Sequence, residues 1–309
     1  MTPIDLLFEP LQYDFMVRAL IATTIAAVVC ALLSCWLVLV GWSLMGDAVA
    51  HSVFPGVVIA YSLGAPFAVG ALVFGFLAVG LIGAVRETRR VKEDAAIGIV
   101  FTTLFALGLV LVSVTPSQID LGHIIFGNVL GVSAVELLQI GAIALVVATV
   151  LMLKRRDLTL FAFDQAHAHA IGLNPKIISA LLLGLLALTT VVALQVVGVI
   201  LVVAMLIIPG GTAFMLTDRF GRMLMIAPLI AALSSVLGIY LSYWLDASSG
   251  GLVVLVQGAV FAIVALTSPR HGLLARLITA RRRTLTPRSR PSLRARLAQS
   301  DTREGVERQ

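Results

Sequence analysis

The lysine and arginine residues of this 309-residue chain fall into short clusters separated by long stretches that contain neither. Residues 19–85 and 94–153 lack both, and residues 177–217 have no charged side chain of any kind. A helix needs about 20 apolar residues to cross a bilayer, so these stretches have room for three, two and two crossings. Hydrophobic residues make up 60% of the chain and charged residues only 12%, whereas soluble domains are about 25% charged. The sequence predicts an all-α, polytopic transmembrane bundle.

Eight or nine membrane helices are expected, all in one domain that covers residues 1–269. The predicted spans are 16–40, 46–63, 67–85, 95–114, 134–153, 177–195, 197–215, 224–245 and 251–268. Residues 270–309 are different, because they hold 11 Arg and three acidic residues and so carry a net charge of +8. This segment is predicted to be a disordered cytoplasmic tail that contacts anionic lipid headgroups. It has no aromatic residues among its arginines, so binding to nucleic acid is not indicated.

The basic clusters predict which loops face the cytoplasm, because cytoplasmic loops of membrane proteins are enriched in Lys and Arg. The clusters lie at residues 86–92, 154–156, 219–222 and in the tail. The loops near residues 66, 116–120 and 246–250 lack Lys and Arg and are expected outside. The side of the N-terminus depends on segment 46–63. If this segment crosses fully, the N-terminus lies outside, and if it is broken or re-entrant, the N-terminus can lie inside.

Asp47 and His51 are the only ionisable acidic, basic or histidine side chains between residues 19 and 85. An ionisable residue within a membrane span costs about 2.5–3.5 kcal/mol on insertion scales and is a functional candidate for that reason. A spacing of four residues places both side chains on one helical face, where a carboxylate and an imidazole can coordinate a divalent cation. Pro55 and Gly56, just beyond, weaken the helix. Two structural alternatives stay open: a hydrogen-bonded pair that joins helices, or an Asp47 that lies in water at a helix end.

Other polar residues give weaker signals. His123 is expected at the outer interface, and Glu136 and Gln195 lie near the ends of predicted helices. His167 and His169 are two residues apart and therefore on different helical faces, so a shared metal is not expected. Asp164 can cap a short helix that runs to Ile171 and is stopped by Gly172 and Asn174-Pro175. A short helix on the cytoplasmic side could dock a soluble partner, or could be an ordinary loop.

Six sequence patterns, in order, resemble the permease subunits of the zinc, manganese and iron class of bacterial ABC importers. They are residues 43–56 (SLMGDAVAHSVFPG), 92–98 (KEDAAIG), 125–131 (IFGNVLG), 164–174 (DQAHAHAIGLN), 198–209 (GVILVVAMLIIP) and 210–213 (GGTA). The resemblance covers about residues 44–269. The chain departs from the family pattern at Gly210-Gly211, where small residues such as alanine are expected, and in the 247–250 turn, which lacks an expected proline.

The resemblance implies a transport permease of the bacterial inner membrane that is not itself an enzyme. A second permease, identical or paralogous, a separate ATP-binding subunit and an extracytoplasmic metal-binding protein would complete the transporter. Asp47 and His51 match the family's intramembrane metal site, and Asp164, Ala168, Gly172 and Asn174 match its ATPase-docking segment. No resident cofactor is implied, only a transported ion. The context of Asp47 and His51 is most similar to manganese and iron permeases, and manganese is the preferred ion over iron and zinc.

Two rival functions can be weighed on the sequence. A transporter driven by an ion gradient would require several intramembrane carboxylates and is often built from inverted repeats, whereas Asp47 stands almost alone. An intramembrane enzyme is disfavoured because the chain has neither His-Glu-x-x-His nor paired intramembrane aspartates. The chain also lacks the phosphate-binding Gly-x4-Gly-Lys-Ser/Thr loop. We therefore expect ATP hydrolysis to occur in a partner.

Overall fold

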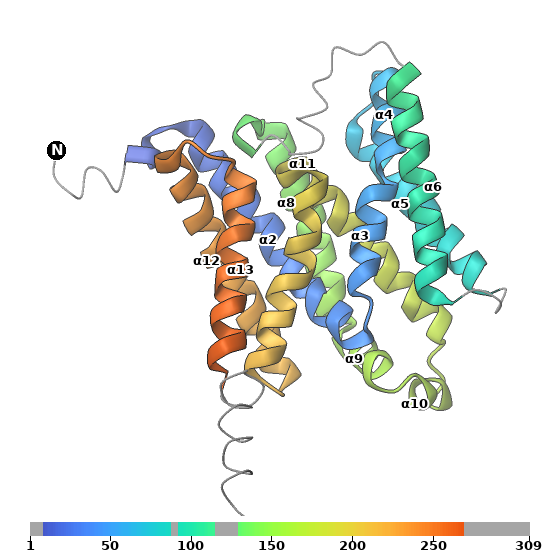
Figure 1. Ribbon diagram of the computed structural model, residues 1–309. Helices are drawn as coiled ribbons and strands as arrows, with labels where there is room; N and C mark the ends of the chain where they lie inside the picture. Colours follow the sequence, from blue (N-terminus) through green and yellow to red (C-terminus); the bar gives the residue numbers. More distant parts are fainter. Residues whose placement is uncertain (1–8, 88–91, 115–128, 269–309) are drawn as a thin grey trace, which may run out of the picture. The chain divides into compact units, whose positions relative to one another are not determined.

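The computed structural model describes residues 9–87, 92–114 and 129–268 (Figure 1). The elements are η1 (Glu9–Gln12), α2 (Asp14–Val40), α3 (Ser43–Ser52), α4 (Phe54–Ser62), α5 (Phe67–Glu87), α6 (Glu93–Val114), η2 (Val129–Gly131), α8 (Ala134–Leu153), α9 (Arg155–Phe163), α10 (Gln165–Ala170), α11 (Pro175–Leu216), α12 (Phe220–Leu245) and α13 (Ser249–Thr267). In these described ranges, eight segments are long and apolar enough to cross a membrane, and a ninth apolar segment, Leu201–Leu216, is shorter. The predicted all-α membrane bundle is confirmed.

The chain divides into two compact units, Met1–Val264 and Ala265–Gln309, and only residues 265–268 of the second are described. The predicted domain boundary after residue 269 therefore lies outside the described residues and stays a prediction. The same is true of His123 and of the structure of the basic tail.

Helix α2 lies at the centre of the first unit and packs against α8, α11 and α12. Its buried side chains are mostly small, with Ala, Cys and Ser next to Leu and Trp, so neighbouring helices can approach closely, as is usual in membrane proteins. Helices α5, α6 and α8 instead leave most of their apolar side chains exposed or only half-buried. Such a surface would be unfavourable in water and is expected against lipid.

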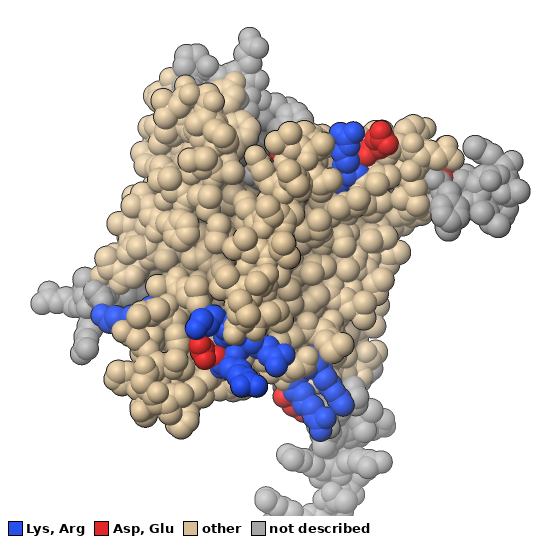
Figure 2. Space-filling view, turned by 180° about the vertical axis from the view of Figure 1, so that it is seen from behind, with Lys and Arg blue, Asp and Glu red and all other residues tan. Residues whose placement is uncertain are grey.

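Among the described residues, most Lys and Arg side chains gather at one end of the bundle, the lower end in Figure 2, and this is the end at which α9 and α10 lie in Figure 1. The positive-inside rule marks it as the cytoplasmic end. Segment α3–α4 begins at this end and reaches the opposite one, because its 20 residues extend about 30 Å at 1.5 Å per residue. The segment therefore crosses fully although it is broken. Of the two predicted positions for the N-terminus, the structure supports the outer one.

Helix α11 is two helices that meet at Gly198, whose φ of 76° and ψ of 174° are not helical. The chain enters α11 and leaves it at the same cytoplasmic end, so it doubles back near this residue (Figure 1). A positive φ costs glycine nothing but strains other residues. The two predicted spans 177–195 and 197–215 are thus confirmed as separate arms.

Close approaches between helix backbones depend on glycine at a few positions. A methyl group added at Gly56 of α4 would lie 2.7 Å from the carbonyl carbon of Gly70 in α5, and one added at Gly70 would lie 2.7 Å from that of Gly56. At Gly210 an added methyl group would lie 2.8 Å from the carbonyl carbon of Ser34, whereas at Gly211 it would meet nothing within 4 Å. The departure from alanine at residue 210 therefore has a steric reason, because α11 touches α2 there.

Candidate functional site

The candidate site begins on α3, just before a break in the segment. Pro55 has no N–H to donate to the carbonyl oxygen of His51, which stands four residues earlier, so the helical hydrogen-bond pattern is interrupted at this position. Helix α3 ends at Ser52, Val53 lies between the two helices, and α4 starts at Phe54 with Pro55 in its first turn. The predicted weakness of the helix at Pro55 and Gly56 is confirmed. The break leaves His51 in the last turn of α3.

Asp47 and His51 point toward each other on one face of α3. The Oδ1 atom of Asp47 lies 3.2 Å from the Nε2 atom of His51, and the two side chains are 35% and 23% exposed. The His51 ring packs edge-on against Phe105 of α6, with ring centroids 5.1 Å apart, and lies 5.8 Å from Phe101. The Nδ1 atom of His51 is buried without a hydrogen-bond partner. Two aromatic rings therefore fix one side of the imidazole while Nε2 faces the carboxylate.

The spacing of the two ligand atoms suits a chelated cation. Metal bonds from carboxylate oxygen and imidazole nitrogen are about 2.0–2.2 Å long, and two such bonds to atoms 3.2 Å apart enclose an angle of roughly 100°. This angle lies between the octahedral and tetrahedral values, so a divalent ion could bind with little movement of either side chain. Among the described residues no group of three or more His, Cys, Asp or Glu side chains converges on one point. Two ligands are fewer than Mn²⁺, Fe²⁺ or Zn²⁺ prefers, so the described residues alone would leave coordination positions open.

The first structural alternative, a hydrogen-bonded pair that joins helices, stays open. Asp47 and His51 contact each other within α3, and the His51 ring also packs against α6. The second alternative, an Asp47 near water, is partly met. Asp47 stands four residues into α3, about 6 Å from its cytoplasmic end, and His51 about 12 Å from it. The carboxylate therefore lies in the cytoplasmic half of the span rather than at its centre.

The segment between α8 and α11 contains the predicted short helix and a further helix, α9, that was not predicted. Asp164 caps α10 as expected, because its Oδ1 accepts a hydrogen bond from the backbone N–H of His167 at 2.8 Å. Asn174 caps α11 by accepting from the N–H of Lys176 at 3.0 Å. Gly172 takes a φ of 89° between the two helices, and Ala168 is fully buried.

Of the four predicted docking residues, Asp164, Gly172 and Asn174 are exposed and Ala168 is buried, and their role in docking stays a prediction. The exposed face of α10 is made by other residues, among them His167, Ala170 and the 56% exposed Ile171. Ala168 was expected in docking only because it matches the family's docking segment, and a helix of six residues is too short for periodicity to identify its exposed face. Gly172 and Asn174 stop α10 and start α11, so they set the direction in which the exposed face points.

Aromatic contacts join α9 to the rest of the bundle. The Trp42 ring, directly before α3, meets the Phe161 ring edge-on with centroids 6.2 Å apart. On α2, Trp36 donates a hydrogen bond from Nε1 to Thr159 Oγ1 at 3.3 Å and packs edge-on against Phe220. Helix α9 therefore contacts both α2 and Trp42, the residue that precedes α3, and α3 carries Asp47 and His51.

Two other polar candidates have structural roles or remain undescribed. Glu136 forms a capping box with Ser133 at the start of α8, with Ser133 N–H to Glu136 Oε2 at 2.8 Å and Glu136 N–H to Ser133 Oγ at 3.2 Å. It is thus engaged at the helix end. The side chain of Gln195 lies outside the described residues.

Comparison with known proteins gives consistent matches over nearly the whole membrane domain. The model of the ABC 3 transport family matches residues 12–268. A manganese transport system membrane protein, MntB, of Synechocystis is 51% identical over 87% of this chain and 88% of its own length. A chelated iron transport system membrane protein, YfeC, of Yersinia pestis is 48% identical over 88% of this chain and 92% of its own length. The solved structure of PsaBC from Streptococcus pneumoniae in complex with Fab superposes with a TM-score of 0.81, at 34% identity over 88% of this chain and 99% of that one.

Proposed function

Because this chain belongs to the ABC 3 transport family, we propose that it is the permease through which an importer moves manganese into the cell. A separate subunit hydrolyses ATP and drives alternating access. The family match is to an ABC transport family, so the gradient-driven alternative has no support. The multi-pass permease is a component of an ABC transporter complex and carries no ATPase chemistry of its own.

The Asp47–His51 pair is the observation that supports metal transport. A carboxylate oxygen and an imidazole nitrogen 3.2 Å apart form a donor set for Mn²⁺, Fe²⁺ or Zn²⁺. Relatives named for manganese and for chelated iron are about equally similar to this chain. We choose manganese because hard oxygen donors suit it and because water can supply the remaining ligands in a partly exposed site.

Two ligands per chain favour a site shared between two permeases. In a dimer with two-fold symmetry each residue near the axis meets its equivalent, so two Asp and two His could surround one ion. A paralogous permease would serve equally if it carried the same pair. The ATP-binding subunit would dock on the exposed face of α10, and an extracytoplasmic metal-binding protein would deliver the ion at the opposite end of the bundle.

Metal uptake by cells that express variants tests the proposal. Asp47→Asn and His51→Ala should each abolish uptake of radioactive Mn²⁺ without loss of membrane insertion, because each removes one of two ligands and the helix tolerates both changes. Competition by unlabelled Fe²⁺ and Zn²⁺ in the native protein measures the preference among the ions.

Asp246→Asn is a matched control. Asp246 ends α12 at the outer end with a φ of 47°, a conformation that asparagine tolerates, so the same loss of a carboxylate should leave uptake normal. Near-normal Mn²⁺ uptake by both site variants would overturn the ligand assignment. Stronger competition by Zn²⁺ than by unlabelled Mn²⁺ would leave the ligand assignment intact and would show that zinc, not manganese, is the preferred ion.

A further inference from the structure

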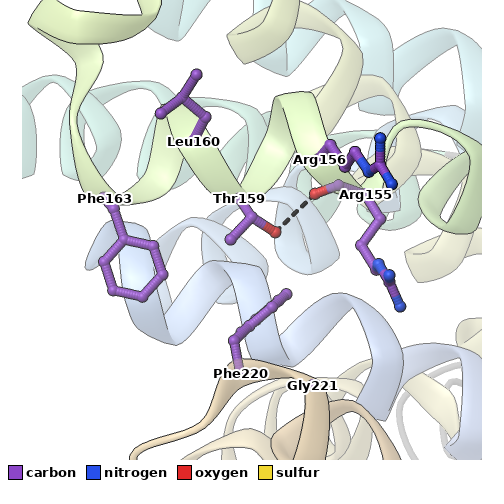
Figure 3. A pocket seen from close by; sticks show the side chains of 7 residues that line it. All are labelled: Arg155, Arg156, Thr159, Leu160, Phe163, Phe220 and Gly221. Carbon is purple, nitrogen blue, oxygen red and sulfur yellow. Dashed lines mark hydrogen bonds between the residues drawn. The ribbon is translucent and has the colours of Figure 1, made fainter.

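A groove of about 490 Å³ opens at the cytoplasmic end of the bundle between α9 and the first turn of α12 (Figure 3). Residues Arg155, Arg156, Leu160, Phe163 and Phe220 line it, together with Thr159 and Gly221. Neither the Asp47–His51 pair nor the exposed face of α10 contributes to it. The groove therefore has no part in the proposed metal site.

The groove combines positive charge with apolar walls. Arg155 and Arg156 supply two guanidinium groups at one end, and the nearby carboxylate of Asp157 is paired with Lys154 at 3.4 Å. In the described part of the chain, no ion pair joins either arginine to an acidic side chain. Phe163 is 66% exposed, and the half-buried Leu160 and Phe220 complete the apolar walls.

Helix α9 has the amphipathic pattern of a helix that lies at a membrane surface. Leu158 and Phe161 are buried against the bundle, while Arg156, Leu160 and Phe163, spaced at four and three residues, share the face that lines the groove. The helix begins two residues after Leu153, which ends α8 and is 78% exposed, and Met225 of α12 is 75% exposed one turn beyond Gly221. Exposed apolar side chains on the adjoining membrane helices place the groove at the boundary between hydrocarbon and headgroups.

We infer that this groove binds one anionic phospholipid of the cytoplasmic leaflet. The phosphate would accept hydrogen bonds from Arg155 and Arg156, since guanidinium groups match phosphate geometry. An acyl chain would lie along Leu160, Phe163 and Phe220. Basic pockets at the cytoplasmic side of membrane helices bind anionic headgroups in this way. A partner that docked only on the exposed face of α10 would leave Phe163 and the two arginines exposed to water, whereas a bound lipid would cover them.

Native mass spectrometry of the complete permease–ATPase complex tests the inference. Delipidated complex is titrated with dioleoyl phosphatidylglycerol, and the molecules retained per permease chain are counted. The double variant Arg155→Gln/Arg156→Gln should bind about 25-fold more weakly, at about fivefold per arginine. Phe163→Ala should also weaken binding. The control Lys92→Gln/Lys176→Gln removes the same charge outside this groove, keeps the Lys154–Asp157 pair and should bind normally.

Three further arms identify the occupant. Dioleoyl phosphatidylcholine should bind much more weakly at this position, and millimolar glycerol phosphate should not displace the bound lipid, because it has no acyl chain. Retention of phosphatidylglycerol at native affinity by the arginine double variant, in protein that elutes normally on gel filtration, would overturn the inference. An equal loss of lipid affinity in the lysine control would show general attraction to a basic surface and would contradict a specific site in this groove. Release of lipid when the ATPase binds would assign the groove to that subunit.

Discussion

Replacing Gly56 by alanine is expected to force α4 and α5 apart. The new methyl group would clash first with the carbonyl oxygen of Gly70 and would lie 2.7 Å from its carbonyl carbon and 2.8 Å from a ring carbon of Phe74. Ordinary contact begins at 3.4 Å, so the backbones must separate by at least 0.7 Å (3.4 − 2.7) at this crossing. Overpacking of this kind costs about 1–3 kcal/mol, and alanine recovers roughly 1 kcal/mol of helix propensity. The net loss of stability is therefore up to about 2 kcal/mol.

Thermal unfolding of the purified permease in detergent measures this loss. A drop of a few degrees in Tm is expected for Gly56→Ala, at about 2–4 °C per kcal/mol, and a similar drop for Gly70→Ala. Gly80→Ala in α5 is the control, because an added methyl group there has no atom within 4 Å; its Tm should be unchanged or higher.

The double variant gives the sharpest test of the geometry. The two methyl groups act at one crossing, so the first separation makes room for the second, and Gly56→Ala/Gly70→Ala should cost clearly less than the sum of the single changes. Strict additivity, or a Gly56→Ala protein as stable as the native one, would show that the two backbones do not touch here.

Three further predictions concern other elements. Ile171→Glu should prevent co-purification of the ATPase at unchanged Tm, whereas Ala168→Glu should lower Tm, because only the former is exposed; co-purification with Ile171→Glu would refute docking on this face. In unfolding assays, Gly210→Ala should destabilise while Gly211→Ala should not, and equal effects would contradict the α2–α11 contact. Truncation after residue 285 should leave the preference between Mn²⁺ and Zn²⁺ unchanged in uptake assays; a changed preference would show that the tail contributes to selectivity.

Much of the fold could be predicted because charge and apolar length directly constrain membrane helices. The predicted span 16–40 differs from α2 by two residues at its start, and the predicted break near residue 196 lies within two residues of Gly198. Sidedness of the N-terminus could not be predicted, because Pro55 breaks a helix equally well whether or not the chain continues in the same direction. Here α4 resumes after a single residue, Val53.

Part of the candidate site was predictable because polar side chains are rare in membrane helices. Asp47 and His51 stand out because almost nothing else in their stretch is polar, and helical spacing brings them together. Their setting against Phe101 and Phe105 depends on how α6 packs on α3, which no local pattern reveals. Helix α9 was missed because its nine residues mix charged and apolar side chains. Its apolar positions 158 and 161 were the available signal.

The contact between Trp42 and Phe161 has a mechanical consequence. Helix α9 is an arm about 13 Å long, joined to α10 through the single residue Asp164 and braced against α2 by Trp36 and Thr159. A force on α10 would rotate α9 about its contact with α2 rather than translate it. This rotation would displace the Trp42 ring, which directly precedes α3 and stands five residues before Asp47. Movement at the cytoplasmic surface would then reach the proposed metal ligands through the Trp42–Phe161 contact and the first turn of α3.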